Sequence, residues 1–555
     1  MTSADIQPDR AGAARADETV DAVVVGAGPN GLVAANLLVD AGWEVLVLET
    51  QDTVGGAVRS DRALSPEFVH DTCSSFYPLA AASPTIASLD LESHGLTWVH
   101  APAVLGNPLP NGDWALLHRD RERTAAGLES QAAGDGEAWM ALCRQWDKVG
   151  DDVVGALLTP MPPLKHGARL LGRLPRSQGT DLVRMLARPA RSLCQEHFTG
   201  KGAQLLVAGN ALHADISMDA PGSGLMGWLL VMLGQHVGFP VPQGGAGELS
   251  QALARRLEAR GGSVRTSTRV DRVLVEDGRA TGVVTWHGDR VRARRAVVAD
   301  VVAPTLYGDL VDGSHLPSRL RRHMRGFEWD PGTFKVDWAL DGAIPWADRP
   351  TPAPGTVHIA DSLEELADSQ LQINNGAVPT RPFMLTGQMT VTDPTRSPRG
   401  TESFWAYTHV PHRVRYDAGD GGITGAWDAA DNERMADRMQ DRVEEYAPGF
   451  GDRVRVRRVL SPRDLQDLDE NLVGGALNGG TSSLHQQAVL RPTPGLGRAE
   501  TPVRGLYLAS ASAHPGGGVH GACGSNAARA ALFHDRVRSG RRALARLLPS
   551  HGDRT

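Results

Sequence analysis

The chain has 555 residues, of which 41% are hydrophobic and 22% are charged, so it can bury a large core and is expected to form two or more domains. Its formal net charge is −7 and no basic face is evident, which argues against a nucleic-acid partner. No run of 18 or more apolar residues occurs, so the sequence predicts no transmembrane helix. The abundance of alanine, arginine and glycine hints at a bacterial source.

The first 19 residues mix acidic residues with arginine and lack the apolar core of a secretory signal. We therefore expect residues 1–19 to form a disordered leader. The chain contains four cysteines, Cys73, Cys143, Cys194 and Cys523. None belongs to a C-x-x-C or other close pair, which predicts neither a local redox disulfide nor a cysteine zinc site and fits a reducing cytoplasm.

The segment VVVGAGPNG at residues 23–31 has the pattern of a dinucleotide-binding turn. An apolar strand at residues 22–25 leads into it, and a helix-like stretch follows. Gly26 permits the tight turn, Gly28 leaves room for a pyrophosphate, and Gly31 lets the helix pack closely on the strand. The helix start offers free N–H groups and a positive dipole end to phosphates. Asn30 lies in the same turn and is counted among the predicted cofactor-binding residues.

An acid and a second glycine turn indicate which dinucleotide is bound. The next apolar strand, residues 43–48, ends at Glu49, whose carboxylate can accept hydrogen bonds from ribose hydroxyls. Gly55, Gly56 and Arg59 then form a second close backbone approach with a cation. FAD benefits from such a segment near its pyrophosphate, whereas a nicotinamide enzyme has no evident need for it.

The segment 101–239 is expected to belong to a substrate domain. Residues 136–154 read as a helix, and residues 157–176, rich in proline, glycine and basic residues, read as an irregular connection or mobile loop. Gly222, Gly224 and Gly227 match G-x-G-x-x-G, but no apolar strand precedes them and no strand with a terminal acid follows. We interpret them as a glycine-rich helix that packs closely, so the chain shows no second nucleotide unit for NAD(P)H.

The pattern of apolar and polar residues changes at residues 240–300. A helix with leucines spaced by four ends at Gly261. Alternating strands then follow at residues 263–270, 271–276, 281–287 and 290–295, and a short apolar strand follows at 296–299. From residue 306 to about 495, scattered aromatics among alternating strands predict an antiparallel sheet covered by helices.

The C-terminal block GLYLASASAHPGGGVHGACGSNAARAAL, residues 505–532, contains an apolar strand, a glycine turn and the start of a small-residue helix. Together with GGALNGGTSSLHQ before it, this block resembles the phytoene-desaturase-like flavoproteins, and within them the pyridine nucleotide-disulfide oxidoreductase domain-containing protein 2 type. The resemblance extends from about residue 20 to residue 535. The name of this type suggests disulfide chemistry, but this sequence has no closely spaced pair of cysteines that could perform it.

The resemblance implies an α/β fold in which a glutathione-reductase-like, Rossmann-type FAD-binding domain is interleaved with an α+β substrate domain containing an antiparallel sheet. It implies that Val270 places backbone groups against the adenine, although a plain strand role is an equal alternative. The helix start after the glycine turn can aim N–H groups at the flavin edge. The residues predicted there are Gly517, Gly518, Val519 and His520.

The predicted domain order follows from these segments. It reads as leader 1–19, FAD-binding parts 20–100, 240–305 and 496–535, substrate parts 101–239 and 306–495, and a basic C-terminal tail 536–555. Basic and apolar residues alternate at roughly helical spacing over residues 527–548. This pattern fits either a membrane-surface helix, hence peripheral membrane contact, or a solvated terminal helix with one packed face.

No strong catalytic constellation stands out. His514 and His520 flank the glycine turn and are weak candidates for a proton shuttle or substrate contact; the alternative is that they shape the turn and cap the helix. His485 and Gln486 are weaker candidates, and Cys523 is read as a packing residue rather than a reactive thiol. No metal site is predicted.

The leading functional hypothesis is an FAD-dependent oxidoreductase that transfers a hydride from a substrate C–H or C–N to flavin N5. The substrate is a small molecule, either a lipophilic isoprenoid or an amine, and oxygen, a quinone or another carrier reoxidises the flavin. One alternative is a regulatory or interaction protein with structural FAD, and another is NAD(P)H-driven reduction. Substrate, acceptor and homo-oligomer formation stay open at this point.

Overall fold

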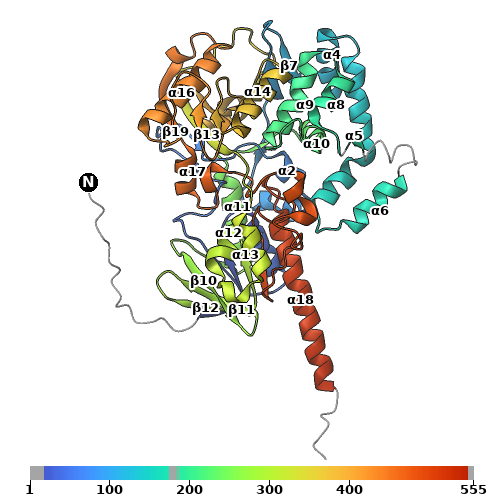
Figure 1. The fold of residues 1–555 in the computed structure, drawn as a ribbon, viewed down its shortest axis with the longest axis vertical. Helices are drawn as coiled ribbons and strands as arrows, with labels where there is room; N and C mark the ends of the chain where they lie inside the picture. The colour runs from blue at the N-terminus through green and yellow to red at the C-terminus, as the bar shows by residue number, and fades with distance from the viewer. Residues whose placement is uncertain (1–17, 174–183, 186, 548–555) are drawn as a thin grey trace, which may run out of the picture.

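The computed structural model describes residues 18–173, 184–185 and 187–547, which form two seven-stranded sheets and the helices around them. In Figure 1 the first sheet lies in the lower half with α11, α12 and α13, and the second lies in the upper half with α14, α16 and α17. Helices α4, α5 and α8 to α10 form a separate group beside the second sheet.

The first sheet is built on parallel strands that are buried on both faces. β1 (Glu18–Val25) lies between β2 (Val45–Leu48) and β12 (Arg290–Ala299), while β9 (Ser263–Arg265) extends the sheet beyond β2 and β20 (Leu506–Leu508) pairs with β12. Near-continuous valine, leucine and alanine runs produce this arrangement, because helices cover both faces of a parallel sheet. The Rossmann-type expectation is confirmed.

An antiparallel meander is attached to the same sheet. β10 (Val270–Glu276) and β11 (Arg279–Thr285) form a hairpin, and β11 pairs with the first half of β12. Two details differ from the sequence expectation. The segment 263–270 contributes β9 to the parallel sheet, and the strands expected at 290–295 and 296–299 form one strand, β12, whose charged first half faces the meander and whose apolar second half lies in the core.

Three helices pack around the nucleotide-binding turn. α1 (Pro29–Asp40) follows β1 and contacts both α11 (Gly247–Ala259) and the long helix α18 (Ala522–Leu547). Their apolar faces form one core cluster with the inner residues of β1 and β2. The start of the C-terminal helix is thereby placed beside the start of the first helix.

The elements that follow β12 also pack on the first sheet. These are α12 (Ala303–Thr305), the short helical turns η2 (Leu306–Leu310) and η3 (Gly313–His315), and α13 (Ser318–Arg325). Leu306, Leu310 and Leu320 share a core cluster with residues of β10 and β12. Residues 306–325 therefore pack with the first sheet through their apolar side chains.

The second sheet is mainly antiparallel, with order β19-β13-β17-β16-β14-β6-β7. The strands are β6 (Ala103–Pro108), β7 (Trp114–Leu117), β13 (Gly332–Leu340), β14 (Pro354–Ile359), β16 (Met384–Gln388), β17 (Glu402–Val410) and β19 (Val454–Leu460). One pair, β14 with β6, is parallel. Because β6 and β7 come from an early segment and the others from a late one, this sheet joins two distant parts of the chain. On the sheet pack α14 (Leu363–Asn374), α16 (Ala429–Glu444) and α17 (Pro462–Leu468).

A helical layer stands beside the second sheet. It contains α4 (Arg121–Gln131), α5 (Asp135–Leu158), α8 (Ala190–His197), α9 (Lys201–His213) and α10 (Ser223–His236). A Cβ added to Gly224 would lie 2.8 Å from the Arg188 carbonyl oxygen, and one added to Gly227 would lie 2.5 Å from that of Val207. Close helix packing therefore explains this glycine motif, as expected.

The connection after α5 is more regular than the sequence suggests. The composition of residues 157–176 predicts an irregular or mobile segment, but α6 (Leu164–Arg173) occupies most of the described part. His166 Nδ1 lies 3.2 Å from Asp152 Oδ1, and its ring packs where a Cβ on Gly155 would be. The glycines and prolines of this segment concealed the helix, which forms where it can pack on α5.

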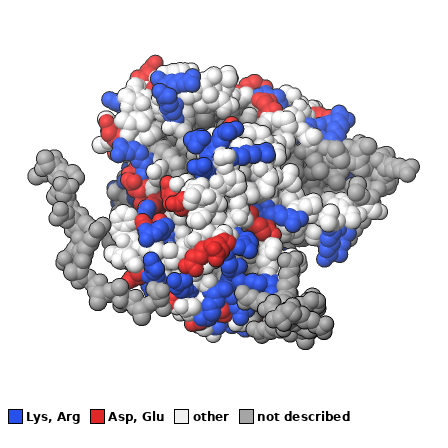
Figure 2. Space-filling model, turned by 60° about the horizontal axis from the view of Figure 1, so that its bottom comes forward, with Lys and Arg blue, Asp and Glu red and all other residues white. Residues whose placement is uncertain are grey.

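The described residues nearest the two ends of the chain belong to β1 and α18. Most of the expected leader lies outside the described residues, apart from Glu18 and Thr19, which begin β1. The expected basic tail continues α18 to Leu547, and this helix projects from the body of the molecule (Figure 1). Within the described ranges no helix is long and apolar enough to cross a membrane. Figure 2 shows acidic and basic side chains intermingled on the face beside this helix.

Candidate cofactor and substrate site

The first glycine turn has no room for side chains. Gly26 adopts φ +95°, and a Cβ on Gly31 would lie 2.2 Å from the Gly26 carbonyl oxygen. A Cβ on Gly28 would lie 2.7 Å from Oδ2 of Asp300. The strand, turn and helix therefore meet as a dinucleotide-binding turn requires.

Glu49 lies at the end of β2 and is buried against this turn. Its Oε2 accepts a hydrogen bond of 2.7 Å from the Ala27 backbone N–H, and its Oε1 accepts one of 2.8 Å from that of Gln51. These bonds fix the carboxylate beside the turn. Val270 begins β10 and is buried in one core cluster with Val25 and Leu48, so it lies near the same strand ends.

The second glycine turn packs on the first. The Gly55 N–H donates to the Ala27 carbonyl at 2.9 Å, and a Cβ on Gly56 would lie 3.4 Å from the Gly28 Cα. The Arg59 guanidinium donates to the carbonyls of Gly56 and Leu468 at 2.8 and 2.7 Å. The cation is thus held beside both turns.

The C-terminal glycine block joins these segments. A Cβ on Gly517 would lie 2.2 Å from Asn478 Oδ1, one on Gly518 would lie 2.7 Å from Leu79 Cδ1, and Val519 has φ +55°. Gly524, which the sequence reasoning did not single out, packs against the Asn30 carbonyl oxygen, 1.9 Å from an added Cβ. The small residues of GACG were the signal for this contact.

The chain's own groups fit an anionic dinucleotide at the start of α1. The Gly31 N–H at this helix start donates a hydrogen bond to a carboxyl oxygen, Oδ2 of Asp300, at 2.8 Å. Oδ1 of Asn30 is buried and has no hydrogen-bond partner in the part of the chain that the structure describes. Burial raises the pKa of Asp300 to about 8, so this side chain is able to be neutral beside a phosphate.

His514 and His520 are both buried, and burial lowers the pKa of each to about 4. Nδ1 of His520 accepts a hydrogen bond of 3.0 Å from the Ala522 N–H at the start of α18, so this imidazole caps the helix. Nε2 of His514 donates to the Thr159 carbonyl at 3.1 Å. His520 therefore caps α18, as in the alternative considered from the sequence, whereas Nδ1 of His514 is buried without a hydrogen-bond partner among the described residues.

Two further sequence candidates lie elsewhere. The side chain of His485 is 57% exposed and its Nε2 lies 2.9 Å from Glu328 Oε2, so it faces solvent and does not reach a buried centre. Gln486 donates to the Glu328 carbonyl at 2.8 Å. Burial raises the pKa of Cys523 to about 12, which supports its reading as a packing residue.

Sequence reasoning missed a buried polar cluster between the second sheet and α9. Nε2 of His409 on β17 lies 2.7 Å from Oδ1 of Asp215, which follows α9. Tyr407 packs against His409 with their ring centroids 5.7 Å apart, and the ring centroids of His213 and His358 are 5.4 Å apart. The only sequence signal was the alternation of Trp405, Tyr407 and His409 on one face of a strand.

A second buried group of charges lies along the same strand pairs. Lys335 and Asp337 of β13 form a buried ion pair, and Arg458 donates to Asp337 at 2.8 Å. His70 lies 3.9 Å from Asp337, and burial lowers its pKa to about 4. Lys335 is paired with Tyr407 across the sheet, so the two polar groups are neighbours.

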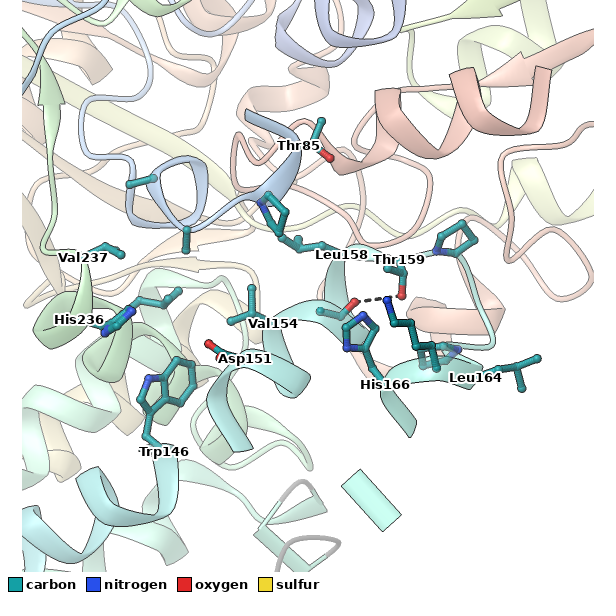
Figure 3. A pocket seen from close by; sticks show the side chains of 18 of the residues that line it. Thr85, Trp146, Asp151, Val154, Leu158, Thr159, Leu164, His166, His236 and Val237 are labelled. Atoms are coloured by element: carbon teal, nitrogen blue, oxygen red, sulfur yellow. Dashed lines mark hydrogen bonds between the residues drawn. The ribbon is translucent and has the colours of Figure 1, made fainter. Parts of the chain in front are cut away.

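A cavity of about 1020 Å³ opens beside the C-terminal block. Figure 3 shows side chains of α3 (Pro84–Ala87), α5, α6 and α10 around it. Thr159, which lines the cavity, accepts the hydrogen bond from His514, and Arg529 of α18 also lines it. The cavity therefore shares a wall with the predicted cofactor site. Within the described ranges, no cluster of His, Cys, Asp or Glu is suited to a metal ion.

Comparison with known proteins agrees with this geometry. Residues 24–89 match an NAD(P)-binding Rossmann-like domain, and residues 156–532 match the family of flavin containing amine oxidoreductases. The chain is 30% identical to the rat pyridine nucleotide-disulfide oxidoreductase domain-containing protein 2 over 93% of both chains. It is 25% identical to a neurosporene-forming phytoene desaturase of Cereibacter sphaeroides over 94% of this chain and 96% of the relative.

Two solved structures share the fold. An oxidoreductase from Methanosarcina mazei superposes with a TM-score of 0.60 at 15% identity, covering 92% of this chain and 99% of the other. A putrescine oxidase with bound putrescine gives 0.59 at 17% identity, covering 94% and 100%. The chain belongs to the flavin-containing amine oxidoreductase family, in its phytoene-desaturase-like branch. It is an FAD-dependent oxidoreductase with a mixed α/β fold.

Proposed function

We propose that this protein is a dehydrogenase for a small organic molecule that enters through the cavity between α5, α6 and α18. The observation that carries the proposal is the shared wall: Thr159 lines the cavity and also accepts the hydrogen bond from His514 of the C-terminal block. A molecule in this cavity lies close to the segments that would hold the cofactor. The reaction class is oxidation of a C–H or C–N bond.

The cofactor would be held by the three glycine segments and their partners. The residues proposed for this role are Gly26, Gly28, Asn30, Gly31, Glu49, Gly55, Gly56, Arg59, Val270, Gly517, Gly518, Val519 and His520. When bound there, FAD supplies the two-electron oxidant. The chain itself contributes N–H donors at the starts of α1 and α18, the Arg59 cation, and a buried setting that excludes water.

The substrate class draws on the relatives. Proteins similar to this chain include a phytoene desaturase, a subunit of limonene dehydrogenase and a putrescine oxidase, whose names indicate lipophilic hydrocarbons and an amine. The cavity wall combines apolar side chains such as Trp146, Val154 and Leu233 with charged ones such as Lys165 and Arg529. This lining suits a molecule with an apolar body and a polar group. Oxygen, a quinone or another carrier is the proposed electron acceptor, in a cytoplasmic or peripheral membrane location.

Anaerobic bleaching of the flavin band tests the proposal. The purified protein is mixed with isoprenoids, carotenoid precursors, amines, alcohols or NAD(P)H in turn, and the flavin absorbance is followed. One donor class should bleach the flavin at a rate that saturates with concentration. Bleaching by NAD(P)H alone would contradict the proposal.

A pair of variants tests the route of entry. Thr85→Trp places a large side chain in the cavity, whereas Ala87→Trp places the same side chain on an exposed position of the same short helix. We expect the first variant to raise the donor concentration needed for half-maximal bleaching at least tenfold, and the second to leave it unchanged. Equal behaviour of the two variants would contradict entry through this cavity.

A further inference from the structure

The buried pair formed by Asp215 and His409 has the arrangement of an acid that orients a base. Nε2 of His409 faces Oδ1 of Asp215 at 2.7 Å, and the two side chains are only 3% and 5% exposed. Both ring nitrogens of His409 and Oδ1 of Asp215 are buried, and none of the three atoms makes a hydrogen bond of normal geometry with any described residue, so the 2.7 Å approach is a close contact between a carboxylate and an imidazole. In the neutral imidazole tautomer that carries its proton on Nε2, the nitrogen beside the carboxylate, the lone pair on Nδ1 is free to accept a proton.

Asn478 connects this pair to the C-terminal glycine block. Its Nδ2 donates a hydrogen bond to Oδ2 of Asp215, while its Oδ1 lies where a Cβ on Gly517 would be. Backbone N–H groups of Leu477 and Asn478 donate to Asp330 at 2.7 and 2.9 Å, which fixes the loop. His409 is therefore joined by two side-chain contacts to the segment proposed to face the flavin.

The surroundings of His409 contain further imidazole nitrogens without partners. Nδ1 of His213 and both ring nitrogens of His358 are buried, and no described residue makes a hydrogen bond with them. Most buried polar side-chain atoms in folded proteins have a hydrogen-bond partner, and an unpaired one costs free energy. Several unpaired nitrogens in one place point to a polar ligand or ordered water between the sheet and α9. A purely hydrocarbon ligand would leave them unpaired.

We propose that His409 is a catalytic base that accepts a proton from an O–H or N–H group of the substrate, with Asp215 as the positioning residue. The O–H or N–H bond breaks and its proton passes to Nδ1 of His409, while the adjacent C–H bond loses hydrogen with its electron pair to the bound FAD as oxidant. A C=O or C=N bond forms. The inference rests on the proposed function and narrows its substrate to a protic molecule. Because His409 does not line the entry cavity, the inference also requires that the substrate pass from that cavity to the space between the second sheet and α9.

The charged and titratable groups around His409 are consistent with this role. Burial alone would lower the pKa of His409, but the Asp215 carboxylate outweighs it and raises the pKa above its usual value. Burial and the charge of Asp215 raise the pKa of Asp330 to about 6. Burial lowers the pKa of His213 to about 4 and raises that of Tyr407 well above its usual range, so both are neutral.

Two cations lie near the edge of this group. Arg491 donates to the Asn478 carbonyl at 2.6 Å and interacts with Asp330, and Lys335 on the neighbouring strand is paired with Asp337. Asp215 is therefore the charged group in direct contact with His409. Since a protonated His409 cannot accept a proton, flavin reduction should speed up as pH rises through its pKa.

The test compares His409→Gln with a matched control in the full-length, FAD-loaded protein. His485→Gln changes an exposed histidine that also faces an acidic partner, Glu328, away from the site. Anaerobic flavin reduction by primary alcohols and amines is measured from pH 5 to 9. We expect His409→Gln to lose about 10² to 10⁴-fold in rate together with its pH dependence, while flavin content stays normal. The control should match the wild type.

Asp215→Asn gives a signature that a purely structural role would not produce. Removal of the carboxylate lowers the pKa of His409, so the rise of the rate should move to lower pH, and Asp215→Glu should restore part of the original profile. The ionisation of an amine substrate affects the pH profile of every variant equally, so it does not change the difference between the profiles. Because the pH profiles are compared among several soluble variants, the test remains possible if one of the variants fails to fold.

Each outcome bears on one of the two claims. A wild type reduced by hydrocarbons but by no alcohol or amine would uphold the dehydrogenase and overturn the base. An unchanged rate in flavin-loaded His409→Gln would also overturn it. If this variant does not fold, the pH profiles of the wild type and of Asp215→Asn are compared instead. A wild-type rate that shows no ionisation, or an ionisation that Asp215→Asn does not shift, would overturn the base. A wild type that no donor reduces would contradict the proposed function itself.

Discussion

The nucleotide-binding region and the substrate region of this protein are specified in different ways. At the first, three glycine turns meet because no side chain fits between them, and each turn is a continuous segment. At the second, a polar cluster forms where the end of α9, strand β17 and the loop at Asn478 converge. Local backbone constraints define one region, whereas long-range packing defines the other. Substitutions in the first should abolish cofactor binding, and those in the second should change chemistry with the cofactor still bound.

The largest effect should come from Gly524→Ala, where α18 meets α1. The new Cβ would lie 1.9 Å from a backbone oxygen of Asn30, so the helices must separate. Overpacking of this kind costs about 1–3 kcal/mol, and here we expect the upper end together with loss of bound flavin. Flavin content and thermal unfolding measure the two effects.

The same helix offers a matched control. Gly540 has open space around its Cα, so Gly540→Ala adds a methyl group without a contact and should be neutral or stabilise by up to about 1 kcal/mol. If both variants kept their flavin and unfolded at the same temperature, contact between the two helix starts would not be what joins the glycine segments.

The contrast between the regions explains what the sequence could predict. The glycine fingerprint, Glu49 and the C-terminal block were found from the sequence because each is a continuous segment of at most about thirty residues. In each segment, the types of residue at fixed spacings are enough to indicate the role. Asp215 and His409 come from elements distant in sequence, and neither has a neighbour that marks it. The helix α6 was missed because it depends on packing against α5 at Gly155, which local composition does not reveal.

A second prediction concerns Asp300, which belongs to the nucleotide-binding region but was not singled out by the sequence. Its pKa is raised to about 8 by burial, so it is protonated at neutral pH and ionises as the pH rises through 8. The ionised carboxylate beside Gly28 and Gly31 should repel the cofactor phosphates. We expect FAD affinity of the apoprotein to fall roughly tenfold between pH 6 and pH 9, as one unit of pKa coupling would give.

Asp300→Asn removes this ionisation and keeps the size of the side chain. Its FAD affinity, measured by quenching of flavin fluorescence, should vary little over the same pH range. The stability of the apoprotein follows the same sign: a carboxyl with a raised folded-state pKa stabilises at pH values below its unfolded pKa and loses that contribution as pH rises to about 8. A wild-type affinity that increased with pH would contradict this account.

The smallest effect should follow modification of the cysteines, and it separates flavin chemistry from disulfide chemistry. All four cysteines are unpaired, and burial raises the pKa of Cys143 to about 11 and those of Cys73, Cys194 and Cys523 to about 12. Because the thiolate is the reactive form, native protein should react slowly with thiol reagents. Flavin reduction by the identified donor should be unchanged after such treatment, whereas the denatured chain should titrate four thiols. Rapid loss of activity upon alkylation of one cysteine in the folded protein would instead place a thiol at the reacting centre.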